Sequence, residues 1–338
     1  MVMNKNYKEI QGHECLSACV GGLLGFYNKD VTPNSIILLG NGGIIKYSET
    51  EDIMTTNMYA ANFKFFDRYD IQYKVRKVEN GSDFQSVDFQ LREEVNKRNT
   101  PILKLVSNHL PYSRVFSQAQ NATHYICLIG YDEADYYILD NYVPSSIPAT
   151  YSGKIEKLNL IKCLSDGSYI IVEDINKIGN IDIGKDLVNS VINYIDFYMQ
   201  GGKDEYFQYG QDAALNFFKV VGNRGARNTV SKLLDYNFQL KVYGFISLKS
   251  IFINIFSKLT SKISCIQAQS CIEKYKQIIG EWYNISMYML KCGHTKKDEN
   301  YQKLIERVIM CNGKEIDLLS EMRNICKEIF VKIGERPK

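Results

Sequence analysis

Apolar residues recur at steps of three and four along the segment that follows the N-terminal tail. Leu16, Val20 and Leu23 share this spacing, which predicts a helix over residues 15–27 with one apolar stripe and with Cys15 in its first turn. A similar pattern through Ile53, Met54, Met58 and Ala61 predicts a second helix, over residues 50–67, that begins at a Thr50 cap. The stretch "LLGNGG" between the two is predicted to be a loop.

The next hundred residues alternate between extended and helical patterns. Residues 71–78, 101–107 and 168–174 read as strands, and residues 82–99 read as a helix. Two runs of β-branched and aromatic residues in "HYICLIGYDEADYYILDNY" (124–142) flank a polar break, which predicts a β-hairpin.

The pattern changes near residue 178, after which long amphipathic stretches dominate and strand signals nearly vanish. The sequence therefore predicts an α+β fold, with a first domain of mixed helices and strands over residues 1–176 and a mainly helical domain over residues 177–338.

Composition narrows the class of protein and its partners. Of the 338 residues, 45% are hydrophobic and 23% are charged, which is typical of a globular chain. A net charge of +3, from 41 basic and 38 acidic residues, gives no basic stripe, so we expect no nucleic-acid partner. The chain has no apolar leader and no window of about 18 uninterrupted apolar residues, so we expect a cytoplasmic protein with no membrane partner. Nine cysteines without a repeated CxxC spacing suggest free thiols, and we expect no metal and no cofactor.

One cysteine lies where a nucleophile would be activated. The pKa of a thiol falls at a helix N-terminus and beside an imidazolium, and Cys15 meets the first condition. His124 opens the predicted hairpin, and Asp140 ends its second strand, so the three form a candidate Cys-His-Asp triad. A hairpin loop of odd length places Asp140 on the face of His124, whereas an even loop places Asn141 there instead.

Three residues just before Cys15 raise further questions. The amide of Gln11, with the backbone N–H of Cys15, is a candidate oxyanion hole. His13 either assists substrate binding or is an exposed flanking residue. Glu14 either repels the thiolate or faces water.

These motifs carry a resemblance to a known superfamily. The cysteine helix after a glutamine and the segment "THYICLIGYDEADYYILDNY" resemble the papain superfamily, especially its double-glycine peptidases and the butirosin biosynthesis protein H family. More narrowly, the chain is similar to amide-forming enzymes of the closthioamide type. The segment "YFQYGQDAALNFFKVV" (206–221) is similar to the start of the helical second domain in the butirosin H group. The resemblance implies a papain-like (double-glycine-peptidase-like) catalytic domain.

The same resemblance implies an activity. An acyl group would pass from the phosphopantetheine thioester of an acyl carrier protein to Cys15, and then to a small amine, with a diamine as one option. The chain departs from the peptidases in two ways: Gln11 precedes the cysteine by four residues instead of six, and Leu16 replaces the glycine after the cysteine. The alternatives are a cysteine peptidase and a non-catalytic binding protein with a papain-like fold.

Overall fold

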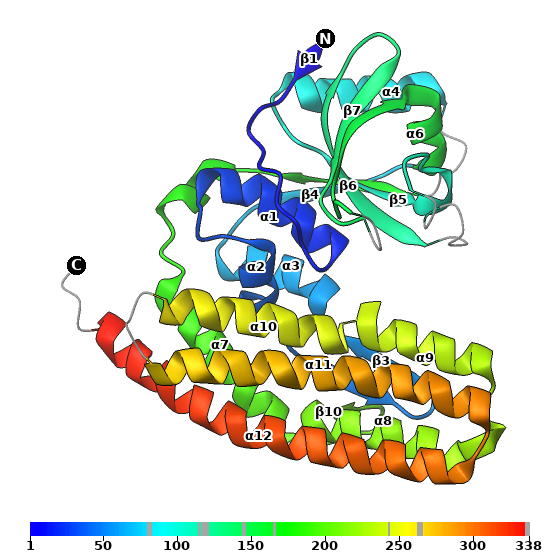
Figure 1. Cartoon of the computed structure of the whole chain (residues 1–338). Helices are drawn as coiled ribbons and strands as arrows, with labels where there is room; N and C mark the ends of the chain where they lie inside the picture. The colour runs from blue at the N-terminus through cyan, green and yellow to red at the C-terminus, as the bar shows by residue number, and fades with distance from the viewer. Residues whose placement is uncertain are drawn as a thin grey trace. The chain divides into compact units, whose positions relative to one another are not determined.

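The computed structural model describes residues 1–79, 83–113, 116, 122–143, 147–164, 167–242, 244–261 and 266–334. The chain divides into two compact units (Figure 1). Unit 1 comprises Met1–Gly40 and Tyr59–Ile183, and unit 2 comprises Asn41–Met58 and Gly184–Lys338.

Unit 1 is built on a seven-stranded antiparallel sheet. Its strand order is β4-β9-β5-β6-β7-β8, and β1 pairs with the end of β6. The strands are β1 (Val2–Met3), β4 (Tyr73–Lys77), β5 (Ile102–Val106), β6 (Thr123–Tyr131), β7 (Asp135–Asp140), β8 (Tyr151–Glu156) and β9 (Ser168–Val172).

Helices pack against both faces of this sheet. Leu91 of α4 (Phe84–Asn96) and Leu160 of α6 (Lys157–Cys163) join the same buried cluster as Leu128 of β6. Helix α1 (Cys15–Tyr27) also packs against β6, where the Cys127 thiol lies 4.0 Å from the carbonyl oxygen of Cys19. Because side chains alternate along a strand, α1 covers the face opposite to that cluster.

The segment between the first helix and residue 67 differs from its prediction. Residues 53–56 form a strand, β3 (Ile53–Thr56), and the helix α3 (Met58–Arg68) begins only after it, so the predicted helical start at Thr50 is wrong. Strand β3 pairs with β2 (Ile45–Ser48), which outweighs the local helical spacing. An unpredicted helix, α2 (Pro33–Leu39), begins at a capping box formed by Thr32.

Unit 2 is mainly helical, with one small sheet of order β10-β2-β3. Strand β10 (Gln208–Tyr209) pairs with β2, and β2 pairs with β3. The longer helices are α7 (Gly184–Gln200), α8 (Gly210–Arg224), α9 (Val230–Val242), α10 (Phe245–Thr260), α11 (Ile266–Thr295) and α12 (Asp298–Gly334).

The stretch Val230–Thr260, which covers α9 and α10 and includes residue 243 outside the described part, is long and apolar enough to cross a membrane by length and composition alone. In its apolar window, 65% of the residues are buried inside the structure. The core helix of a globular unit passes the same test, so the stretch is weak support for a membrane span.

The division into units differs from the predicted one at two places. Unit 1 continues to Ile183, beyond the predicted end at residue 176, because the carbonyl oxygens of Ile178 and Ile181 accept hydrogen bonds from Asn28 at 2.9 Å. The β2–β3 hairpin belongs to unit 2, where the N–H of Met54 donates to the Gln239 side chain at 3.0 Å. Long-range contacts of this kind leave no trace in local periodicity.

A buried ion pair lies in the core of unit 2. Lys249 and Glu315 are fully buried, and the ammonium nitrogen lies 2.7 and 2.8 Å from the two carboxylate oxygens. The same carboxylate accepts hydrogen bonds from Tyr198, Tyr275 and Trp282 at 3.1, 2.7 and 2.8 Å. These partners offset the cost of burying two charges and connect α10 and α12 with α7 and α11.

Removing the carboxylate charge should destabilise unit 2. Glu315→Gln leaves the Lys249 ammonium buried without its counter-charge, and we expect the free energy of unfolding to fall by about 3 kcal/mol. Urea unfolding followed by the fluorescence of Trp282, the only tryptophan of the chain, measures this change. The control is Glu281→Gln in the solvent-exposed pair with Lys314, which should cost less than about 1 kcal/mol. Equal free energies of unfolding for the two variants would contradict a stabilising role of the buried Lys249–Glu315 pair.

Candidate functional site

His124 is held rigidly at the start of β6. It lies opposite Leu105 of β5, only 4% of its surface is exposed, and its ring centroid is 4.5 Å from that of Phe116. Neighbours on two sides therefore restrict the imidazole to a narrow range of orientations.

Asp140, the last residue of β7, contacts this imidazole directly. Its Oδ2 lies 2.8 Å from His124 Nε2 and accepts a second hydrogen bond, also at 2.8 Å, from the Tyr112 hydroxyl. The backbone N–H of Tyr142 donates to Oδ1 at 3.0 Å. Three donors thus surround a fully buried carboxylate, which offsets the cost of its burial.

The hairpin loop alone would not place Asp140 beside His124. Tyr131 is the first β6 residue to pair with β7, opposite Tyr136, so four residues separate the paired positions, and this even number turns Asn141 toward the histidine. The predicted condition for Asp140, a loop of odd length, is therefore not met.

A β-bulge restores the register. The pairing shifts by one residue between Leu128 and Gly130, and beyond the shift Cys127 pairs with Leu139. A shift of one residue moves every later side chain of the strand to the other face. Asp140 then lies diagonally across from His124, and the even loop and the bulge together act as an odd loop.

The carboxylate determines which imidazole nitrogen can act as a base. A carboxylate only accepts hydrogen bonds, so His124 Nε2 carries the hydrogen in this contact. This tautomer leaves Nδ1 with a free lone pair. Burial, and then the charge of Asp140, raise the pKa of Tyr112 well above its usual value, so this hydroxyl remains a donor to Asp140.

Cys15 lies at the start of α1, as predicted, but its electrostatic surroundings are not those expected. Its thiol donates a hydrogen bond to Glu14 Oε1 at 3.6 Å, and the backbone of Tyr125, the residue after His124, lies near the sulfur. Burial, followed by the charge of Glu14, raises the pKa of Cys15 well above its usual value, although the Tyr125 contact lowers it. The predicted lowering of this pKa by the helix start is outweighed by burial and then by Glu14, which occupies that helix end.

The structure brings the candidate residues together only in part. His124 and Asp140 are in contact, and Cys15 lies against the backbone next to His124. Within the described part of the chain, the thiol makes no hydrogen bond to the imidazole. Gln11 is exposed, and its side chain makes no hydrogen bond among the described residues.

Asn141 has a different role from Asp140. Its side-chain amide donates to the Tyr7 hydroxyl at 2.9 Å and to the Ala18 carbonyl oxygen at 3.2 Å. Its own carbonyl oxygen accepts from the N–H of Gly12 at 3.2 Å. A Cβ atom at Gly12 would lie 2.6 Å from the Cβ of Ala18, so the chain approaches α1 closely here. Asn141 therefore connects the end of β7 to α1 and to the segment that leads into it.

The sequence did not point to Tyr112 near the site, and it did not identify Glu14 as the helix cap. Tyr112 follows the short 3₁₀ helix Ser107–His109, and its ring stacks on Tyr151 of β8 with centroids 4.0 Å apart. No local pattern points to this tyrosine, because tertiary structure alone brings it to Asp140. Glu14, in contrast, lies next to Cys15 in the sequence, and a carboxylate just before a helix is a capping signal.

His13 remains partly exposed, and burial lowers its pKa. Its imidazole is therefore mostly neutral near neutral pH. Among the described residues, no group of three or more His, Cys, Asp and Glu side chains could hold a metal ion.

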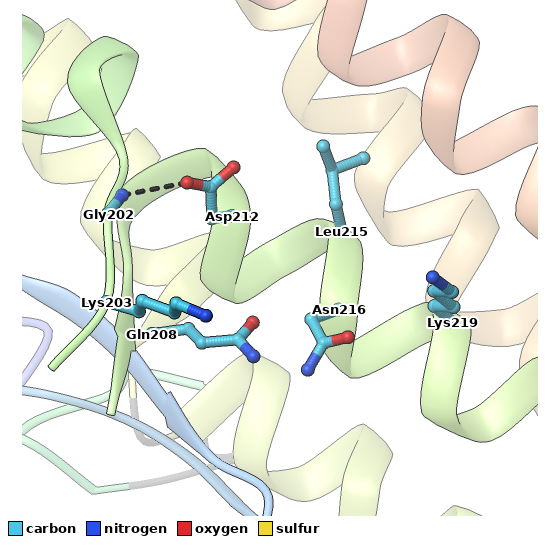
Figure 2. Close-up of a pocket in the computed structure, with 7 residues that line it drawn as sticks. All are labelled: Gly202, Lys203, Gln208, Asp212, Leu215, Asn216 and Lys219. Atoms are coloured by element: carbon cyan, nitrogen blue, oxygen red, sulfur yellow. Dashed lines mark hydrogen bonds between the residues drawn. The ribbon is translucent and has the colours of Figure 1, made fainter. Parts of the chain in front are cut away.

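A separate polar pocket of about 430 Å³ lies within unit 2 (Figure 2). Gly202 donates its N–H to Asp212 at 2.8 Å on one wall, and the buried side-chain nitrogen of Asn216 has no hydrogen-bond partner among the described residues. None of the predicted site residues lines this pocket. Its lining consists of Gly202, Lys203, Gln208, Asp212, Leu215, Asn216 and Lys219.

The chain matches no known protein-family model and no curated protein. The sheet and helices show an α+β fold.

The hydrogen bonds around Asp140 can be tested through local stability. Asp140→Ala leaves the Nε2–H of His124 and the Tyr112 hydroxyl without an acceptor, and should reduce local stability by about 3 kcal/mol. Tyr112→Phe removes one donor but retains the ring that stacks on Tyr151, and should cost about 1 kcal/mol. Hydrogen exchange of β6 and β7 peptides measures both effects.

The matched control is Asp135→Ala at the other end of β7. This carboxylate forms a partly exposed ion pair with Lys154 at 3.6 Å, so its loss should change exchange little. Equal exchange in Asp140→Ala and Asp135→Ala would show that the buried contacts do not stabilise the hairpin.

Proposed function

We propose that unit 1 is a cysteine-dependent acyltransferase that forms amide bonds. In this proposal, Cys15 takes an acyl group from the phosphopantetheine thioester of an acyl carrier protein and transfers it to a small amine. The supporting observation is the buried His124–Asp140 pair, in which the carboxylate holds Nε2 and leaves Nδ1 as the basic nitrogen. His124 precedes Tyr125, whose backbone lies near the Cys15 sulfur. The resemblance to papain-like acyltransferases agrees with this arrangement.

The first step exchanges one thioester for another. The Cys15 sulfur forms a bond to the acyl carbon, and the bond from that carbon to the pantetheine sulfur breaks. The proton of Cys15 passes through His124 Nδ1 to the departing sulfur. Because the bonds formed and broken are of the same kind, this step costs little free energy.

The second step forms the amide. The amine nitrogen bonds to the acyl carbon, the bond to the Cys15 sulfur breaks, and a proton of the amine passes through His124 to that sulfur. Asp140 holds the Nε2–H tautomer and stabilises the imidazolium that forms in each step.

The raised pKa of Cys15 determines the timing of proton transfer. At neutral pH the sulfur is mostly a thiol, so it must lose its proton to His124 as it attacks. The enzyme would thus depend on general-base catalysis instead of a preformed thiolate–imidazolium pair.

The acyl intermediate can be detected directly. We expect an acyl-pantetheine thioester to add one acyl group to the intact protein, as measured by mass spectrometry, and Cys15→Ala to abolish this adduct. His124→Gln should slow its formation by about a hundredfold or more, since a positioned general base typically contributes that much. Adding an amine should release the acyl group as an amide.

The matched control is Cys19→Ala, one turn further along α1, where the thiol is fully buried and should not be acylated. An adduct that persists in Cys15→Ala would refute the assignment of the nucleophile. Hydrolysis of peptides, without aminolysis, would favour a cysteine peptidase. Unchanged function in His124→Gln would favour a non-catalytic binding protein.

A further inference from the structure

Glu14 caps the helix that carries the candidate nucleophile. Its backbone is extended, and its two carboxylate oxygens accept hydrogen bonds from the N–H groups of Leu16, at 2.9 Å, and Ser17, at 2.7 Å. Asn62 of α3 donates to the same carboxylate at 3.5 Å. The carboxylate thus occupies the position at the helix N-terminus where a negative charge is most favourable.

The length of this side chain matters. Ser, Thr, Asp and Asn are the preferred N-cap residues, and any of them would satisfy a free N–H of α1. The longer Glu14 also brings Oε1 to 3.6 Å from the Cys15 sulfur, where it accepts the hydrogen bond of the thiol. One oxygen therefore contacts both the Leu16 N–H and the nucleophile.

This geometry opposes a thiolate in two ways. A negative sulfur would lie beside a negative carboxylate, and the N–H groups that would stabilise it are already bonded to Glu14. The same hydrogen bond directs the thiol toward the cap, and the described structure contains no hydrogen bond from this thiol to His124.

We propose that Glu14 is a positioning residue that keeps Cys15 as a resting thiol turned toward the helix cap, from which the sulfur is released to His124 when an acyl donor binds. This inference rests on the proposed acyltransferase function. It implies that an unloaded enzyme protects its sulfur from stray electrophiles and oxidants, which react with thiolates.

Other ionisable groups also face the sulfur, so the effect of Glu14 must be measured against a fixed background. Asp140 adds a smaller negative contribution, and the buried thiol of Cys19 lies one turn further along α1. The hydroxyls of Tyr125 and Tyr59 hydrogen-bond each other at 2.9 Å, and Tyr125 interacts electrostatically with Cys15. None of these groups changes in the variants below.

The test is the pH profile of Cys15 alkylation by iodoacetamide, followed by peptide mass spectrometry in the full chain. Glu14→Asn is the decisive variant because Asn is among the best N-caps but carries no charge and is too short to reach the thiol. We expect it to shift the profile to lower pH and to speed alkylation at pH 7 by about tenfold, which corresponds to about one pKa unit. Glu14→Gln should shift the profile in the same direction.

Two further variants separate charge from capping. Glu9→Gln removes another carboxylate of the N-terminal segment, an exposed one that accepts from Thr150 at 2.7 Å, and should leave the profile unchanged. Glu14→Ala removes both the charge and the cap. If Glu14→Asn behaves like the wild type and only Glu14→Ala differs, Glu14 is merely a structural cap and the inference is overturned.

This test requires no acyl donor, so its result is independent of the proposed function. A shifted profile without any acyl adduct on the wild-type enzyme would leave the control of the thiol by Glu14 intact but refute the acyltransferase. An acyl adduct on Cys15 with an unshifted profile would support the acyltransferase but refute the control of the thiol by Glu14.

Discussion

The contact between His124 and Asp140 depends on one irregularity in a strand. A four-residue loop alone would turn Asn141 toward the imidazole, and the bulge between Leu128 and Gly130 reverses this outcome. The same shift turns Asn141 toward α1, where it holds the segment that leads to Cys15. One extra residue in β6 thus aligns His124 with Asp140 and also anchors the helix that carries Cys15.

Local sequence patterns predicted the helix and strands that carry the candidate site. They failed where contacts between residues far apart in the sequence determine the structure. The spacing of apolar residues predicted α1, and the paired β-branched runs predicted the β6–β7 hairpin, because both signals are local and strong. Residues 53–56 carried a helical spacing, yet pairing with β2 makes them a strand. Tyr112 could not be predicted beside Asp140, because only the folded chain brings its loop to the end of β7.

The helix N-terminus illustrates why a motif does not determine its own electrostatics. A cysteine in the first turn of a helix is expected to ionise easily, but the terminus has few free N–H groups and they favour whichever anion reaches them. Glu14 reaches them within the fold, so the same dipole that could stabilise a thiolate stabilises a carboxylate instead. Burial of the thiol and then the charge of Glu14 therefore raise the pKa of Cys15 instead of lowering it.

The β2–β3 hairpin has a consequence for how this chain can be divided. Because residues 41–58 belong to the mainly helical unit, the polypeptide passes between the units after Gly40, after Met58 and after Ile183. No single cut releases either unit whole: a fragment ending near residue 183 retains a hairpin without the helices it packs on, and the remainder lacks two strands of its sheet. Gene fusion or domain exchange at any one junction would therefore disrupt both units. We expect the two units to be inherited together.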